Sequence, residues 1–496
     1  MSKKTMWLRL ALSAALVWMP GLLGSVPNVA GDSPAMPASS VIMAGVNAVD
    51  EVMTDDGVCT LREGVKAANT NTIYVDAGAG GANDGTSWDD AYTDLQDALT
   101  AASAGDEIWV AAGTYKPTDG ADRAIAFAMV EGVAIYGGFA GTETERSERD
   151  WAANPTVLSG DIGTAGSAGD NSYHVVVAGS TVTETAALDG FVVTGGQASV
   201  QSYESDDSRG GGVLVDGGSP VVRNCSLTNN YAWYDGGGMA VWASGDPIVA
   251  DTTFVDNSVT YYGGGLSSWS DTSPWIVNVR FLGNRSISLS GGGAVNFQST
   301  PTYVNTVFSG NAAATSGYGG GVYNWEASAA FRNVTFSQNA AYWGGGMANS
   351  GCSPTVVNGI LWGNTAGYLG PQIYNTSGVA TVTYSIVQGG YTGEGTLDAD
   401  PAFLDADGPD DLVGTVDDDL SLMPGSPAID AGRNDAVLAD VADLDEDGDV
   451  GEPTPLDLGR DPRFTDGPEE DTGLGDAPLV DMGAYEKQRT CWVRLN

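Results

Sequence analysis

A pattern of about 27 residues is repeated six times between Ser219 and Gln372. Each copy places a bulky apolar residue three positions before an asparagine, and successive asparagines are 27, 27, 27, 28 and 25 residues apart. A fixed period of about 20–50 residues is typical of stacked repeats, in which each unit buries its apolar face only against its neighbours. The repeat therefore decides the fold. The pairs are Leu227/Asn230, Phe254/Asn257, Phe281/Asn284, Phe308/Asn311, Phe336/Asn339 and Leu361/Asn364.

A glycine triplet recurs in nearly the same phase. About 27 residues accommodate three short strands and three turns, so that successive rungs stack about 4.8 Å apart. Glycine permits positive φ and close backbone approach at a bend, whereas asparagine tolerates the left-handed conformation and its amide can bond to the next rung. We predict an all-β, pectate-lyase-like solenoid, a right-handed parallel β-helix over residues 72–397, the handedness following the general crossover preference. The triplets are Gly210–Gly212, Gly236–Gly238, Gly263–Gly265, Gly291–Gly293, Gly319–Gly321 and Gly344–Gly346.

An amphipathic capping helix is expected ahead of the repeats. Ser87 and Asp90 have the spacing of a capping box, so Ser87 is the predicted N-cap. An apolar stripe at helical spacing follows. Such a helix would cover the open end of the first rung, which otherwise exposes apolar side chains and unpaired strand edges. The stripe consists of Tyr92, Leu95, Leu99 and Ala102.

The N-terminus has the composition of an export signal. Three basic residues precede an apolar run from Leu10 to Leu23, and small residues near Ala30 would end it. Residues 1–30 are therefore a predicted signal peptide. No transmembrane helix is expected after its cleavage, because no other stretch reaches about 18 apolar residues. We expect a secreted or surface-displayed protein, peripheral to the cell envelope, and a monomer.

Acidic residues are concentrated after the repeats. The formal charge is −43, and residues 398–486 contain 27 acidic and 3 basic residues. We therefore expect an acidic, loop-rich C-terminal region over residues 398–488, followed by a tail at 489–496. This charge makes nucleic acid and anionic membrane surfaces poor partners, because both carry negative charge.

Two segments resemble exported bacterial repeat proteins. Within residues 46–71, Cys59-Thr-Leu-Arg-Glu-Gly resembles their short Cys-Ser-Leu-Arg-Glu-Ala element, from which Thr60 and Gly64 depart. The Phe-x-x-Asn element followed by Gly291-Gly-Gly-Ala-Val resembles the repeat of polymorphic outer-membrane proteins, which are surface-exposed adhesins. The resemblance implies a bacterial protein with an adhesin-like architecture.

The acidic region carries a third resemblance. Leu422–Gly432 and Val480–Glu486 are similar to the choice-of-anchor Q domain of exported bacterial β-helix proteins. This resemblance implies export and a location at or beyond the cell surface. It names no activity.

Catalysis requires separate consideration, because parallel β-helices include pectate lyases and polygalacturonases. Glycoside hydrolysis needs two carboxylates about 5–9.5 Å apart in one cleft. No two acids of the regular rungs share a phase; Asp251, for example, lines up with Asn224 and Asn278. We therefore expect a non-catalytic protein that acts in adhesion or glycan binding, with a polysaccharide lyase or glycoside hydrolase as the alternative. Weak catalytic candidates remain in the irregular early rungs: Asp161, Asp170 and Asp189.

Aromatic residues recur on both sides of the glycine triplets. The residue after each triplet should point inside, so strand alternation places the aromatic residue at the fourth position outside. Stacked rings would protect the glycine-rich bend, and flat apolar faces also suit sugar rings or a protein surface. Both uses are open, and the expected partner is a polysaccharide, a cell-surface glycan or a protein. The residues are Trp242, Trp269, Phe297 and Trp325 after the triplets, and Tyr234, Tyr262, Tyr318 and Trp343 before them.

An acidic loop is the best metal candidate. Alternate carboxylates with Gly448 at the sixth position match the first half of an EF-type calcium loop. Thr454 replaces the usual glutamate at the twelfth position, and Glu452 or Asp457 would complete the ligand shell. We expect structural Ca²⁺ here; a solvated acidic loop is the alternative. The expected ligands are Asp443, Asp445, Asp447, Asp449 and Glu452.

Overall fold

The computed structural model describes residues 71–465 and 469–488. All of them belong to one compact unit, Thr60–Asn496. The predicted signal peptide, the Cys59 element and the tail at 489–496 lie outside the described residues. No helix in the described ranges is long and apolar enough to cross a membrane.

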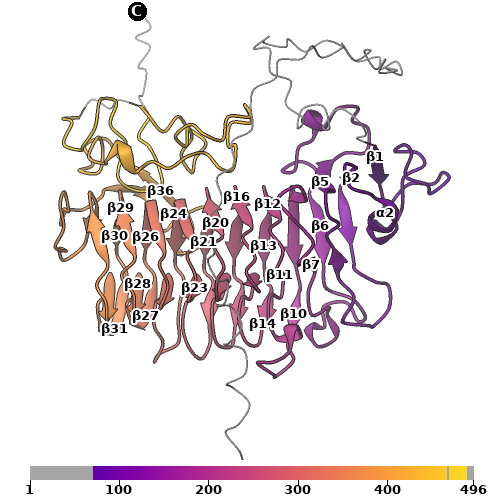
Figure 1. Ribbon diagram of the computed structural model, residues 1–496, viewed down its shortest axis with the longest axis horizontal. Helices are drawn as coiled ribbons and strands as arrows, with labels where there is room; N and C mark the ends of the chain where they lie inside the picture. The colour runs from indigo at the N-terminus through magenta and orange to yellow at the C-terminus, as the bar shows by residue number, and fades with distance from the viewer. Residues whose placement is uncertain (1–70, 466–468, 489–496) are drawn as a thin grey trace, which may run out of the picture. The chain divides into compact units, whose positions relative to one another are not determined.

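Parallel strands from successive rungs form three sheets (Figure 1). Sheet A has 19 strands, sheet B has nine, and sheet C has four, with a two-stranded continuation. The strands of sheet A are β1 (Thr72–Val75), β2 (Glu107–Ala111), β3 (Gly113–Tyr115), β5 (Ala134–Phe139), β6 (Thr156–Ser159), β8 (Ala187–Asp189), β9 (Phe191–Thr194), β12 (Val221–Arg223), β13 (Ser226–Thr228), β16 (Ile248–Ala250), β17 (Thr253–Val255), β20 (Trp275–Val277), β21 (Arg280–Leu282), β24 (Thr302–Ser309), β26 (Ala330–Ser337), β29 (Thr355–Val357), β30 (Ile360–Trp362), β33 (Thr381–Thr383) and β34 (Ile386–Val387).

The remaining strands form sheet B, sheet C and one antiparallel pair. Sheet B contains β4 (Phe127–Ala128), β7 (Val176–Gly179), β11 (Val213–Asp216), β15 (Met239–Trp242), β19 (Leu266–Trp269), β23 (Ala294–Phe297), β25 (Val322–Trp325), β28 (Met347–Ser350) and β32 (Ile373–Thr376). Sheet C contains β10 (Gln197–Ala198), β14 (Tyr231–Ala232), β18 (Ser258–Val259) and β22 (Arg285–Ser286), continued by β27 (Ala340–Trp343) and β31 (Thr365–Leu369). An antiparallel pair, β35 (Phe403–Asp405) and β36 (Asp419–Leu422), lies in the acidic region.

A regular rung contains four short strands, such as β12 to β15, where the sequence predicted three. The extra strand arises because sheet A bends at one residue in the left-handed conformation. Asn224 (φ 51°), Asp251 (φ 44°) and Asn278 (φ 54°) occupy this bend in successive rungs. We call this series the sheet A bend. Asn and Asp tolerate positive φ better than other non-glycine residues, because their short side chains bond locally.

The apolar ladder fills the interior, as predicted. Rings of Phe254, Phe281, Phe308 and Phe336 are fully buried and stack in succession at centroid distances of 4.7 Å. Burial of each ring from water contributes roughly 1.5–3 kcal/mol. Because the ladder runs through consecutive rungs, each rung depends on its neighbours for this burial.

The asparagine ladder is also buried, and its amides bond between rungs as predicted. Asn284 Nδ2 donates to the Phe254 carbonyl at 2.8 Å and to Asn311 Oδ1 at 3.0 Å. The expectation that these asparagines adopt the left-handed conformation is wrong. The positive φ belongs to the preceding residue, such as Asp256 (φ 51°) or Gly283 (φ 62°). That residue makes the turn, and the asparagine after it points inward.

The glycine triplets have both predicted properties. The first glycine has positive φ, as at Gly291 (70°). The third faces the apolar ladder: a Cβ on Gly293 would lie 2.9 Å from Cδ1 of Phe308. A larger residue there would displace the ring or the backbone.

The capping helix is shorter than predicted. α2 (Leu95–Ala101) begins after Asp94, whose carboxylate accepts from Gln96 N at 2.9 Å. Ser87 is not the N-cap; its hydroxyl accepts from Asp90 N at 3.1 Å and closes a turn instead. Tyr92 extends the first rung through a parallel bridge to Val75. Leu95, Ala98 and Leu99 nevertheless pack into the core of the first rungs, as a cap should.

The acidic region docks on the sheet A bend, which continues through Asn305 (φ 47°), and its carbonyl groups accept hydrogen bonds from the side chains of the bend. Asn278 Nδ2 donates to the Asp457 carbonyl at 3.0 Å, and Asn305 Nδ2 donates to the Leu456 carbonyl at 2.8 Å. Apolar contacts accompany these bonds, because Leu444 packs against the outer side of β20 and β24. The acidic region therefore covers one edge of the coil (Figure 1).

Candidate functional site

An aromatic layer covers the outside of sheet B. Met239, Leu266, Ala294 and Val322, which follow the triplets, are fully buried inside the coil, so their alternate neighbours point outward. Ring-to-ring contacts connect the aromatic side chains on this outer surface. We call the set the aromatic band: Tyr234, Trp242, Tyr262, Trp269, Phe297, Tyr318, Tyr323, Trp325, Trp343 and Tyr374.

Small residues lie beneath these rings. Ala240, Ser267, Val295 and Ala348 occupy one outward-facing position in the register of sheet B, yet they are buried. Val295 and Ala348 cluster with Tyr323, and the rings of Tyr262, Tyr318, Trp325 and Tyr374 pack against that cluster. The aromatic band thus forms a second apolar layer outside the main core.

Ring faces in the N-terminal half of the band are used against one another. Trp242 and Trp269 stack at 5.0 Å with an interplanar angle of 14°, and Trp269 and Phe297 stack at 4.2 Å with an angle of 24°. Trp269 is only 7% exposed. These three rings therefore stack on one another, which is one of the two uses that the sequence left open.

Two charged residues that the sequence did not single out fix the start of the band. Buried Asp235 accepts hydrogen bonds from Trp242 Nε1 at 3.1 Å and Ser267 Oγ at 2.8 Å. Burial raises the pKa of Asp235 to about 6, partly offset by the Arg209 guanidinium. That guanidinium lies 3.9 Å above the Trp242 ring, a cation–π distance. Asp235 also forms a parallel bridge with Tyr262 of the next rung.

Rings in the C-terminal half are splayed. Trp325 is turned 79° from Phe297, and it pairs in register with Ser350, which has no ring. Trp343 is inclined by 45° to Tyr374 and by 68° to Tyr368, but it stacks on Tyr318 at 6.0 Å with an angle of 10°. Tyr368 is 58% exposed, and Trp325, Trp343 and Tyr374 are half-buried. Trp325 and Tyr374 therefore lack a parallel ring partner in the described part of the chain.

The three weak catalytic candidates make local polar contacts. Buried Asp189 lies 2.9 Å from Arg149 Nη2 and 3.8 Å from Arg223 Nε, so it is neutralised by two guanidinium groups. Asp161 accepts from the Gly166 amide, and Asp170 accepts from the amide of Thr164 in the same loop. Each of these acids therefore takes part in local hydrogen bonds or ion pairs.

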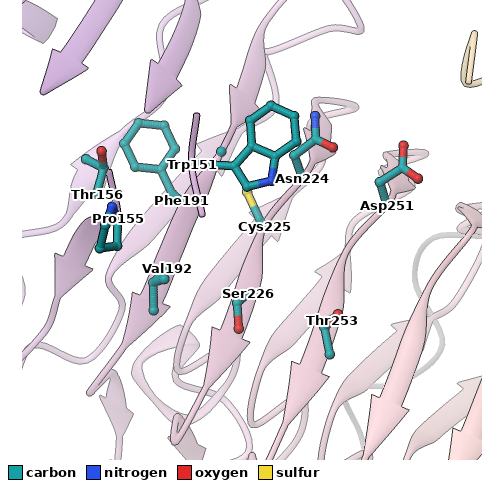
Figure 2. Close-up of a pocket in the computed structure, with 11 residues that line it drawn as sticks. Trp151, Pro155, Thr156, Phe191, Val192, Asn224, Cys225, Ser226, Asp251 and Thr253 are labelled. Atoms are coloured by element: carbon teal, nitrogen blue, oxygen red, sulfur yellow. The ribbon is translucent and has the colours of Figure 1, made fainter. Parts of the chain in front are cut away.

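A cavity of about 280 Å³ opens on sheet A near Trp151 (Figure 2). Asp251 is the only carboxylate among its lining residues, and Arg460 Nη1 lies 3.1 Å from it. Cys225 also lines the cavity, but burial raises the pKa of its thiol to about 12, so it is not a thiolate nucleophile at neutral pH. The cavity therefore lacks the paired carboxylates that glycoside hydrolysis requires.

The acidic loop brings together most of its predicted metal ligands. Carboxylate oxygens of Asp443, Asp445 and Asp447 lie within 4.8 Å of one another. A second group joins Asp445 and Glu452 to Asp440, which the alternating pattern did not include. Asp449 belongs to neither group; its carboxylate accepts from the Gly451 amide. The sequence thus found the loop, whereas Asp440 becomes a member only through the folding of the chain.

One family model matches the chain. Residues 167–361 match the family described as the right-handed beta helix region. The chain is similar to a crystal structure of the pectate lyase Pel9A, at 14% identity and a TM-score of 0.43, covering 86% of this chain and 98% of that chain. It is also similar to a rhamnogalacturonan lyase, at 12% identity and a TM-score of 0.39, covering 71% of this chain and 97% of that chain. A search of curated proteins found no match.

The matched residues contain most of the regular rungs, including the apolar, asparagine and glycine ladders. Strand pairing between successive rungs is parallel throughout the three sheets. The chain is therefore an all-β protein built around a right-handed parallel β-helix.

Proposed function

We propose that this chain is an exported, non-catalytic β-helix protein that binds a neutral polysaccharide or cell-surface glycan. The binding surface is the C-terminal half of the aromatic band together with Tyr368. The observation that carries the proposal is the splayed arrangement of Trp325 and Tyr374 beside the exposed ring of Tyr368. Neither splayed ring has a parallel partner among the described residues, unlike Trp242 and Trp269, whereas Trp343 stacks on Tyr318.

The chemistry of the surface favours a sugar. Aromatic faces pack against the apolar C–H faces of sugar rings, and tyrosine hydroxyls offer hydrogen bonds at the edge. No band residue is charged, and the whole chain has a formal charge of −43. Long-range repulsion therefore disfavours an anionic polysaccharide. Repeated aromatic positions along the coil suit a ligand that itself repeats.

The alternative, a polysaccharide lyase or glycoside hydrolase, lacks an equivalent observation. The carboxylate in the sheet A cavity is paired with Arg460, and Asp189 is held by two arginines. The groups of three carboxylates that converge among the described residues lie in the acidic loop. A cavity with one neutralised acid does not supply both an acid and a base.

Retention and turnover should be measured on the same samples. We expect the purified protein to be retained by neutral polysaccharides in affinity electrophoresis, with no release of reducing ends or unsaturated products over hours. Retention by acidic polysaccharides should be weaker. Turnover that copurifies with the chain would overturn the non-catalytic assignment, and absence of retention on any neutral polysaccharide would overturn the binding assignment.

A further inference from the structure

A buried carboxylate lies at the base of the acidic loop. Asp440 has 0% exposure, and its Oδ2 accepts from Leu444 N at 2.7 Å. Its Oδ1 is buried and has no hydrogen-bond partner among the described residues, and Glu452 Oε1 is in the same condition. Burial of an unpaired carboxylate oxygen is costly unless a proton or a cation compensates it.

Other carboxylates face this buried group. Oxygens of Asp440, Asp445 and Glu452 lie within 4.8 Å of one another, and Asp445 is shared with the group that includes Asp443 and Asp447. Such crowding of like charges is unfavourable in the absence of a cation, and a divalent cation reverses it.

We propose that Ca²⁺ binds between Asp440, Asp445 and Glu452. Asp443 and Asp447 complete its ligand shell, either directly or through a bound water. Ca²⁺ accepts six to eight oxygen ligands at about 2.3–2.6 Å, so oxygens on opposite sides of the ion are about 4.8 Å apart. A mixture of one buried and several exposed carboxylates suits its flexible geometry. Mg²⁺ fits less well, because it demands octahedral geometry and releases its waters reluctantly.

The bound ion would stabilise the packing of the acidic region against the coil. Glu446, in the same loop, lies 3.3 Å from Arg223 Nη2 beside the sheet A bend. The Leu444 carbonyl accepts from Arg460 Nη2 at 2.8 Å, and Arg460 pairs with Asp251 of the bend. Leu444 itself is buried against the outer side of sheet A. A cation that orders residues 440–452 therefore stabilises these contacts, so its role is structural.

Calcium titration of the chelator-treated, full-length protein tests the proposal. We expect calorimetry to show saturable Ca²⁺ binding and the melting temperature to rise with Ca²⁺ concentration, since the ion binds only the folded state. Mg²⁺ should bind at least about tenfold more weakly. Absence of binding at millimolar Ca²⁺, or equal affinity for Mg²⁺, would overturn the assignment.

Variants locate the site within the loop. The double variant Asp445→Asn/Glu452→Gln alters two partly exposed ligands, and we expect it to weaken Ca²⁺ binding at least about tenfold. The matched control Asp449→Asn removes one charge from the same loop outside both carboxylate groups, so it should bind Ca²⁺ within about twofold of the parent. An equal loss of Ca²⁺ affinity in both variants would mean that the negative charge of the acidic loop attracts Ca²⁺ without a defined site, and would refute the proposal.

Discussion

Replacement of one asparagine in the centre of the buried ladder should lower the free energy of unfolding by more than the size of the side chain suggests. Asn311 Nδ2 donates to the Phe281 carbonyl at 2.8 Å and to Asn339 Oδ1 at 2.9 Å. Its Oδ1 accepts from Asn284 N and Asn284 Nδ2, both at 3.0 Å. Asn311→Ala removes all four bonds, and at roughly 0.5–1.5 kcal/mol each the loss is about 2–6 kcal/mol.

Asn311→Asp separates hydrogen bonding from packing, because aspartate keeps the shape of asparagine. It places an oxygen against the two acceptors that Nδ2 served, in a site with no exposure. At pH 8 we expect Asn311→Asp to lower the free energy of unfolding at least as much as Asn311→Ala. The buried carboxyl should have a raised pKa, so the folded state binds an extra proton and the deficit should shrink at pH 5.

Urea unfolding followed by fluorescence and circular dichroism measures both variants. The matched control is Asn229→Asp, since Asn229 is exposed and has φ 54°, a conformation that aspartate tolerates. We expect this control to change stability by less than about 0.5 kcal/mol. The reasoning is refuted if Asn311→Asp at pH 8 is as stable as the Asn229→Asp control.

Two other predictions follow from the packing and the charges. Gly293→Ala should lower the stability of the fold by several kcal/mol, because the added Cβ would lie 2.6 Å from a backbone oxygen and 2.9 Å from Phe308. In the control Gly80→Ala the added Cβ meets nothing within 4 Å, so this variant should melt like the parent. Burial raises the pKa of Asp481 to about 7 and raises that of Glu486. The folded state therefore binds more protons than the unfolded chain, so stability should fall as the pH rises from about 4 to about 7; a rise across that range in denaturant titrations would contradict this.

Period and phase were sufficient to predict the coil. The spacing of Phe254, Phe281 and Phe308 predicted an internal stack, and the structure places them in one. The glycine triplets predicted the tight bends for the same reason. In a solenoid, residues one period apart in the sequence lie next to each other in adjacent rungs. Strand alternation also predicted that the residues directly after the triplets, such as Met239 and Leu266, point inside, and they are fully buried.

Features that depend on contacts between distant segments were not predictable. Tyr92 matches a helical stripe, but a bridge to Val75 recruits it into the first rung. Asp440 lies outside the alternating acidic pattern and approaches Glu452 only because the loop folds back. Sequence phase likewise could not show which rings of the aromatic band are stacked and which are splayed, because ring angles follow from side-chain packing.

Glycan retention by paired variants is the most direct test of the central claim. Trp325→Ala and Trp343→Ala alter the splayed half of the aromatic band, whereas Tyr203→Ala removes a 64% exposed aromatic side chain outside it. On the neutral polysaccharide that best retains the parent, the two band variants should lose at least about tenfold in affinity, equivalent to about 1.4 kcal/mol, a typical cost of losing one stacked aromatic contact. Tyr203→Ala should bind like the parent. Unchanged retention in both band variants, with folding intact by circular dichroism, would contradict the account.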